Sequence, residues 1–90
     1  MMNKVYVVEQ IWEYDGQVDT SIEVFSNLEK AKKQKQKWID GARHFIEDIQ
    51  SCIDNGDIDS HIDNEENYFY AYDGINYDAL TIAIEEKEIL

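Results

Sequence analysis

The chain has 90 residues, 43% of them hydrophobic and eleven of them aromatic, which suffices for the core of one domain and argues against disorder. Its net charge of −12 lies in the second half, because residues 1–43 carry seven acids and seven bases and residues 44–90 carry thirteen acids and one lysine. Such a field repels nucleic acid and anionic membranes and attracts basic surfaces.

Two strands joined by a tight turn are predicted at the start. Residues 4–14 and 18–25 are rich in β-branched and aromatic residues, and Asp15-Gly16 between them is typical of a two-residue type I′ hairpin. The predicted core face of this hairpin is apolar and includes Val5, Val7, Ile11, Val18, Thr20, Ile22 and Val24. The opposite face carries Tyr6, Val8, Trp12, Tyr14 and Phe25, mixed with Asp19, Ser21 and Glu23.

A long helix is predicted over residues 27–54. Ser26 and Glu29 have the spacing of a capping box, and Asn55-Gly56 is a suitable stop. The apolar residues between them fall on one helical stripe: Leu28, Ala31, Trp38, Ile39, Ala42, Phe45, Ile46, Ile49, Cys52 and Ile53.

This helix is too long for the sheet. At about 42 Å it exceeds a nine-residue strand of about 30 Å, so it must overhang the sheet or break, with Gly41 as the expected breaking point. Lys35 lies within the apolar stripe, among the five lysines of residues 30–37. We therefore expect the start of the helix to project beyond the core, with Lys35 at its edge.

The remaining chain predicts an acidic loop at residues 54–67 and a second antiparallel pair at 67–72 and 77–86. Leu80, Ile82 and Ile84 give the last strand an apolar face. The predicted fold is a single α+β domain over residues 1–90. Its order is ββαββ, with a four-stranded, mainly antiparallel sheet and one long helix, continuous or broken, on one face.

The first third of the sequence carries one resemblance to other proteins. The stretch from "KVYVV" through the short hairpin to "EVFSNLEKAKK" resembles small uncharacterised bacterial and phage proteins in which a hairpin ends in "VFS" before a capped helix. It covers roughly residues 4–33. The resemblance implies an α+β fold and no activity.

Metal and cofactor chemistry are not predicted. Asp57, Asp59, His61 and Asp63 alternate like early calcium ligands, but no register supplies the glycine and the final glutamate of a calcium loop. Two histidines and one cysteine cannot form a tetrahedral zinc set by themselves. Glycine-rich phosphate loops are absent from the sequence, and we expect no enzymatic activity.

Two sets of residues are predicted to bind a partner. The first is the acidic surface of Asp57, Asp59, Asp63, Glu65 and Glu66. The second is the aromatic face of Tyr6, Trp12, Tyr14 and Phe25, which a helix on the other sheet face would leave toward solvent. The alternative is that the helix overhang or the acidic loop covers these rings within the molecule.

The leading hypothesis is a small acidic accessory protein that binds a basic macromolecule. A narrower form is a phage or mobile-element inhibitor that mimics DNA on a nucleic-acid-binding protein. The alternative is a self-associating structural module, such as a homodimer. Direct nucleic-acid binding and membrane association are not expected. The single cysteine, the short apolar run at the start and the lack of a window of ~20 apolar residues predict a cytoplasmic protein, bacterial or from a phage-infected host.

Overall fold

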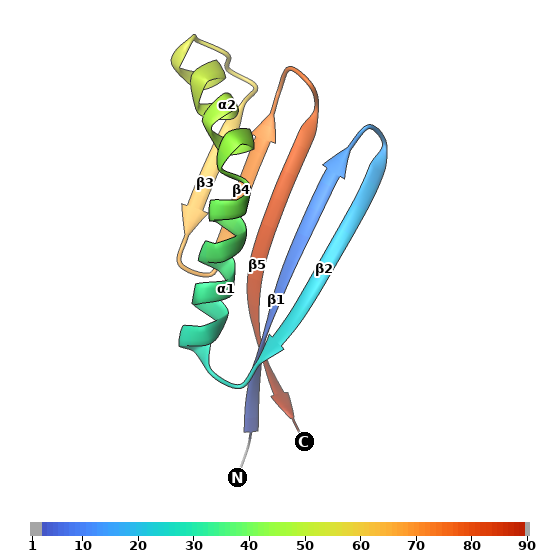
Figure 1. Cartoon of the computed structure of the whole chain (residues 1–90), viewed down its shortest axis with the longest axis vertical. Helices are drawn as coiled ribbons and strands as arrows, with labels where there is room; N and C mark the ends of the chain where they lie inside the picture. The colour runs from blue at the N-terminus through green and yellow to red at the C-terminus, as the bar shows by residue number, and fades with distance from the viewer. Residues whose placement is uncertain (1–2, 90) are drawn as a thin grey trace.

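The chain forms a hairpin, two consecutive helices and three further strands (Figure 1). The structure is a computed structural model and describes residues 3–89. Its elements are β1 (Asn3–Tyr14), β2 (Gln17–Phe25), α1 (Leu28–Gly41), α2 (Arg43–Asp54), β3 (His61–Glu65), β4 (Tyr68–Asp73) and β5 (Asp78–Ile89). The sheet has the order β2-β1-β5-β4-β3, with every neighbouring pair antiparallel.

This arrangement confirms the predicted α+β class and the antiparallel sheet but not their details. Residues 3–89 contain five strands rather than four, and two helices rather than one. Over the same range no helix is long and apolar enough to cross a membrane. The first hairpin follows the predicted register, with Tyr14 paired to Gln17. Its turn residues Asp15 and Gly16 have φ of 49° and 72°, the positive values that a type I′ turn requires.

The strand that was not predicted, β3, lies inside the expected acidic loop. Its residues pair with β4 from His61 opposite Tyr72 to Glu65 opposite Tyr68. Ile62 is the one apolar residue of β3, and it packs against the core. A five-residue edge strand with one inward apolar side chain gives almost no hydrophobic alternation, so its composition resembled that of a solvated loop.

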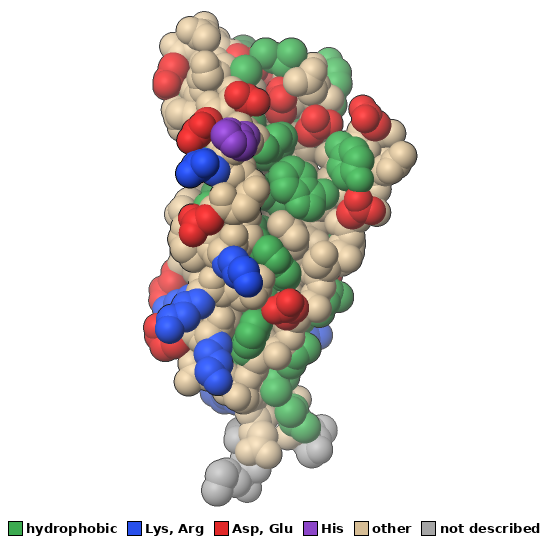
Figure 2. Space-filling model, viewed as in Figure 1, with side chains coloured by type: hydrophobic (Ala, Val, Ile, Leu, Met, Phe, Trp, Pro, Cys, Tyr) green, Lys and Arg blue, Asp and Glu red, His purple; other side chains and the backbone are tan. Residues whose placement is uncertain are grey.

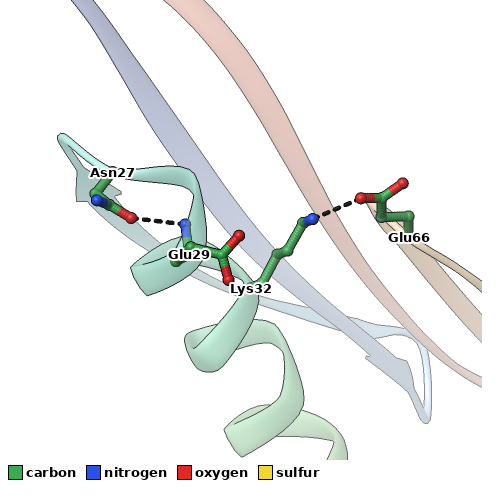
Figure 3. A network of polar contacts seen from close by, with 4 residues as sticks. All are labelled: Asn27, Glu29, Lys32 and Glu66. Carbon is green, nitrogen blue, oxygen red and sulfur yellow. Dashed lines mark hydrogen bonds and ion pairs between the residues drawn. The ribbon is translucent and has the colours of Figure 1, made fainter.

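The start of α1 is capped by Asn27 rather than by Ser26. Asn27 Oδ1 accepts hydrogen bonds from the backbone N–H groups of Glu29 at 2.7 Å and Lys30 at 3.3 Å, and the first is drawn in Figure 3. These contacts satisfy two of the N–H groups that the first turn of a helix leaves without partners. The predicted cap was therefore wrong by one residue.

The long predicted helix breaks where the glycine stands. α1 ends at Gly41, Ala42 has φ −98° and ψ 16°, and α2 begins at Arg43. Of the two outcomes considered, overhang or break, the break at Gly41 is confirmed. It allows α1 to pack against β1, β5 and β2 while α2 packs against β3 and β4.

The helices cover the aromatic face of the first hairpin, which reverses the predicted orientation. Val8 is fully buried, and Tyr6, Trp12 and Phe25 pack against the core. The rings of Trp12 and Phe45 of α2 meet edge to face with centroids 5.1 Å apart. The expectation that the face of Val5, Val7, Ile11, Ile22 and Val24 would be the core is wrong.

Strand register and side-chain size explain this reversal. Leu80 of β5 pairs with Trp12, so the apolar face of β5, which was predicted correctly, continues the aromatic side of β1. Aromatic side chains bury about 150–250 Å² each, more than valine can offer. The other face of β1 also carries Glu9 and Glu13, whose carboxylates are costly to bury without partners.

Lys35 lies in the core rather than projecting at its edge. It is 7% exposed, and its Nζ donates a hydrogen bond to Asn64 Oδ1 of β3 at 3.1 Å. Burial lowers the pKa of the Lys35 ammonium, because the charged form loses hydration. The start of α1 therefore lies over the sheet, and the predicted projection is wrong.

Replacing Lys35 by methionine should raise the free energy of unfolding by about 1 kcal/mol at pH 7, because an apolar side chain of similar length replaces a buried charge. Asn64 is exposed, so water can replace the lost hydrogen bond. Since the folded-state pKa of Lys35 is lowered, the wild type gains stability as pH rises through the interval between the folded and unfolded values. The advantage of the variant should therefore shrink in alkaline solution. Urea unfolding at neutral and alkaline pH measures both effects, and a variant less stable than wild type at pH 7 would contradict them.

Candidate functional site

The sheet face opposite the helices, called the open face below, is not covered by α1 or α2 (Figure 1). Because side chains alternate along a strand, the register assigns every second residue of each strand to this face. The face has an aliphatic half over β1 and β2 and a tyrosine half over β3 and β4. Between them, β5 contributes the small side chains of Ala79, Thr81 and Ala83.

The aliphatic half exposes large apolar side chains along the edge strand β2. Val18, Ile22 and Val24 are 63, 57 and 58% exposed. Val24 pairs with Val7 of β1, and Thr20 of the same row pairs with Ile11. Scattered exposed hydrophobic residues are normal, but a contiguous set on one face marks a candidate binding surface.

The tyrosine half is a row along β4 formed by Tyr68, Tyr70 and Tyr72. On β3 the register places Glu65 beside Tyr68 and Asp63 beside Tyr70. Burial raises the pKa of the Tyr70 hydroxyl, and the negative charge of Glu13 raises it further. Aromatic rings attract cations through their faces, so this row, with carboxylates beside it, is suited to lysine and arginine side chains.

The open face is acidic as well as apolar. In the described part of the chain its ionised side chains are five carboxylates and one lysine: Glu9, Glu13, Asp63, Glu65, Glu85 and Lys87. Lys87 Nζ lies 3.9 Å from Glu85 Oε2, and His61 Nε2 lies 3.0 Å from Asp63 Oδ2. The carboxylates alternate with apolar and aromatic groups, so a partner must bring positive charge and apolar surface together.

The five acidic residues predicted to form one partner-binding surface are divided among three places. Asp63 and Glu65 lie on the open face. Asp57 and Asp59 lie in the connection between α2 and β3, and Glu66 lies in the turn between β3 and β4.

Asp57 forms hydrogen bonds within the connection between α2 and β3. Its Oδ1 accepts a hydrogen bond from the Asp59 N–H at 3.1 Å, and its Oδ2 accepts one from Ser60 Oγ at 2.5 Å. Ser60 Oγ in turn accepts a hydrogen bond from the Gly74 N–H at 3.0 Å. The acidic connection is therefore docked on the β4–β5 connection rather than free in solvent.

Asp73 organises the β4–β5 connection on the other side of this contact. Its carboxylate accepts hydrogen bonds from the N–H groups of Ile75 at 2.9 Å and Asn76 at 3.1 Å and from Asn76 Nδ2 at 3.0 Å. Burial opposes ionisation of Asp73, but these bonds outweigh it and lower its pKa. This contribution to stability is present above the unfolded-state pKa of about 3.9 and is lost as pH falls through the folded-state value.

Glu66 is engaged by the first helix. Lys32 Nζ donates a hydrogen bond to Glu66 Oε1 at 2.5 Å (Figure 3). This hydrogen bond, reinforced by the opposite charges, lowers the pKa of Glu66 and raises that of Lys32. Exposed ion pairs contribute about 0–1 kcal/mol, so its main effect is to tether the β3–β4 turn to α1.

The predicted aromatic site lies beneath or beside the helices. Tyr6, Trp12 and Phe25 pack against the core, and the prediction that they face solvent is wrong. Tyr14 is half-buried, and its hydroxyl donates a hydrogen bond to the Asp19 carboxylate, which raises the pKa of Tyr14. These side chains therefore do not form a continuous exposed face.

The tyrosine row was missed although the sequence contains a signal for it. In "YFYAY", residues 68–72, tyrosines alternate with Phe69 and Ala71, both of which are buried. A period of two places the three tyrosines together on the opposite face of the strand. Glu9 and Glu13 give a similar indication. They lie on the same face of β1 as Val7, and charged side chains are expected on the face that the helices do not cover.

Side chains with catalytic potential lie apart. Cys52 is half-buried, and burial followed by the charge of nearby carboxylates raises the pKa of its thiol, which disfavours the reactive thiolate. His44 is exposed on α2, and His61 lies on the edge strand β3. Over residues 3–89 no three His, Cys, Asp or Glu side chains are grouped so that they could hold a metal ion.

α1 carries a group of exposed lysines that the open face lacks. α1 exposes Lys30, Lys33 and Lys37, and Arg43 begins α2. Figure 2 shows lysine and arginine side chains gathered over the helices. On the helices the lysines are confined to α1, because α2 exposes Glu47, Asp48 and Asp54 beside Arg43.

Similarity to other proteins gives no indication of function. Comparisons of the chain with protein-family models, with curated proteins and with solved structures find no match. The chemistry of the open face is therefore the basis for a functional conclusion.

Proposed function

We propose that the protein is a non-enzymatic binding module of the cytoplasm whose open face recognises a protein with a basic surface. The observation that carries this proposal is the combination on one uncovered sheet face of exposed aliphatic groups, a tyrosine row and alternating carboxylates. Burial of the apolar groups drives association, and the tyrosines hold cationic side chains. The carboxylates select a positive partner and speed the encounter.

Self-association through the open face is less favourable. Two copies placed face to face would oppose five carboxylates to five, with one lysine on each side. Like charges brought together in an interface disfavour that pairing. A basic partner supplies the missing complement, whereas a second copy repeats the same charges.

The narrower hypothesis of a DNA mimic fits the geometry less well. A mimic needs carboxylates free to replace phosphates, but Asp57 is hydrogen-bonded within its own loop and Glu66 is paired with Lys32. The carboxylates of the open face are separated by apolar side chains. This pattern favours an apolar interface with charge selectivity over a copy of a nucleic-acid backbone.

Selection from a displayed library of random peptides tests the proposal without a known partner. The wild type should select peptides with net positive charge that also contain aromatic or β-branched residues. The double variant Glu13→Lys, Asp63→Lys should bind the selected peptides roughly tenfold more weakly, equivalent to about 1.4 kcal/mol. The control Glu47→Lys, Asp48→Lys makes the same change of charge on α2 and should bind within about twofold of wild type.

Two results would contradict this function. One is selection of acidic or uncharged peptides by the wild type. The other is equal loss of binding in the open-face and α2 variants, which would show a response to net charge alone. Sizing the wild type at low and high salt tests self-association, and a stable dimer under both conditions would favour the structural alternative.

A further inference from the structure

β2 forms an edge of the sheet whose outer side is unpaired in the described part of the chain. It is nine residues long and exposed throughout, except for the half-buried Phe25 at its end. The opposite edge strand, β3, has only five residues and is followed by the Lys32–Glu66 contact. β2 therefore offers the longer unpaired edge of the two.

The register identifies the backbone groups that face outward. In a two-residue hairpin the pair next to the turn, Tyr14 and Gln17, is hydrogen-bonded, and bonded pairs recur at every second residue. The N–H and C=O groups of β2 that point away from β1 are therefore those of Val18, Thr20, Ile22 and Val24. The side chains of these residues lie on the open face, so a strand added here would extend that face.

β2 lacks most of the features that usually prevent edge pairing. Protected edges carry proline, lysine, a bulge or an inward-pointing charge, or they are covered. Of these features β2 has only the charges of Asp19 and Glu23, which lie on the helix side of the strand. Residues 17–25 contain no proline, lysine, arginine or glycine, and pairing with β1 runs without a bulge from Tyr14–Gln17 to Tyr6–Phe25. An extended segment can therefore pair along the whole strand.

The charges of β2 disfavour a second copy in this position. In an antiparallel, two-fold pair of β2 strands with full overlap, Val18 faces Val24 and Thr20 faces Ile22 of the other copy. Asp19 then faces Glu23 twice, and like charges directly opposite each other in a sheet are destabilising. A strand with lysine or arginine at these positions is favoured for the same reason.

We propose that β2 accepts an extended segment of the partner as an additional antiparallel strand. Lysine or arginine side chains of that segment face Asp19 and Glu23, and its β-branched side chains continue the row of Val18, Ile22 and Val24. Backbone hydrogen bonds supply affinity, and the alternating side chains supply specificity. This inference rests on the proposed function and specifies how the basic partner is held.

A charge-swap series tests whether the edge pairs as the register requires. Asp19→Lys places lysine opposite Glu23 in both halves of the two-fold pair, and Glu23→Lys places lysine opposite Asp19. Both single variants should dimerise at concentrations at which the wild type is monomeric. The double variant Asp19→Lys, Glu23→Lys opposes lysine to lysine and should be monomeric again. Analytical ultracentrifugation measures the oligomeric state of the wild type and of the three variants. The proposal is overturned if all four proteins are monomeric or if the wild type is dimeric.

A peptide probe tests the chemistry of the partner. The capped heptapeptide Val-Lys-Val-Thr-Val-Lys-Val should bind at least roughly tenfold more tightly than the same peptide with glutamate for lysine. Amide chemical shifts should change most at Val18, Thr20, Ile22 and Val24. Thr20→Pro removes an outward N–H without touching the β1 ladder and should abolish this binding. Equal affinity for the two peptides, or binding that survives Thr20→Pro, would overturn the proposal.

The two proposals can fail separately. If Thr20→Pro leaves the affinity for display-selected peptides unchanged while Glu13→Lys, Asp63→Lys reduces it, the edge inference fails and the open-face function stands. If neither variant changes that affinity, the open-face function itself fails.

Discussion

Replacing Phe69 by alanine should lower the free energy of unfolding by about 3–5 kcal/mol, whereas Tyr70→Ala should lower it by about 1 kcal/mol or less. Phe69 is 2% exposed and belongs to the core under the helices, and Tyr70 lies on the open face. The total free energy of unfolding of a domain of this size is about 5–15 kcal/mol, so Phe69→Ala should be close to unfolding at 37 °C. Urea denaturation of the three proteins measures the difference.

The adjacent substitutions also separate stability from binding. Tyr70→Ala should remain folded and lose affinity for the basic peptides that the wild type selects. A similar loss of stability in both variants would contradict the assignment of faces on β4. Greater destabilisation by Tyr70→Ala would reverse that assignment.

Replacing Gly74 by alanine should cost about 2–3 kcal/mol of stability, because the new methyl group overpacks the contact between two loops. A Cβ at this position would lie 2.5 Å from Asp59 Cβ, 2.8 Å from Asp59 C and 2.9 Å from Ser60 N. Two of these three atoms are backbone, so they cannot move aside by a change of rotamer. The hydrogen bond from the Gly74 N–H to Ser60 Oγ would be strained or lost as well.

Gly41 supplies the matched control for Gly74. A Cβ built on Gly41 meets nothing within 4 Å, and this residue ends α1. Alanine is the better helix former by about 1 kcal/mol, so Gly41→Ala should raise the free energy of unfolding by up to that amount. The midpoint temperature of thermal unfolding should therefore fall in Gly74→Ala and rise in Gly41→Ala. Equal shifts of the same sign would show that the loop contact is not formed as described.

Local signals accounted for the parts of the fold that were predicted correctly. The Asp15-Gly16 turn specified the first hairpin, because both residues adopt the positive φ that this turn needs. Gly41 marked the break between α1 and α2, because a helix of the predicted length did not match the strands. The alternation of apolar residues along β5 also predicted its core face correctly, and Leu80 and Ile82 are fully buried.

The face of the sheet that the helices cover depends on non-local pairing. β1 lies between β2 and β5, and its pairing with β5 joins the two ends of the described chain. The register between β1 and β5 decides whether Trp12 or Ile11 lies on the same face as Leu80. The periodicity of either strand alone does not specify this register. The carboxylates of Glu9 and Glu13 were the one local sign that the valine face of β1 stays uncovered.

The candidate site was predicted only in part. The acidity of the second half was readable from composition, and Asp63 and Glu65 do lie on the open face. The pairing of β3 with β4, which places these carboxylates beside the tyrosine row, was hidden because β3 has a single inward apolar residue. Ser60 and Gly74, which dock the acidic connection, are fourteen residues apart and gave no joint signal.

We propose that a basic protein binds to the open face and not to the outward surface of α1 and α2. Mapping of chemical-shift changes on the wild type bound to a display-selected peptide distinguishes the two surfaces. The largest changes should fall on the tyrosine rings of β4 and on the methyl groups of Val18, Ile22 and Val24. Changes confined to α1 and α2, with the open face unaffected, would contradict the proposal.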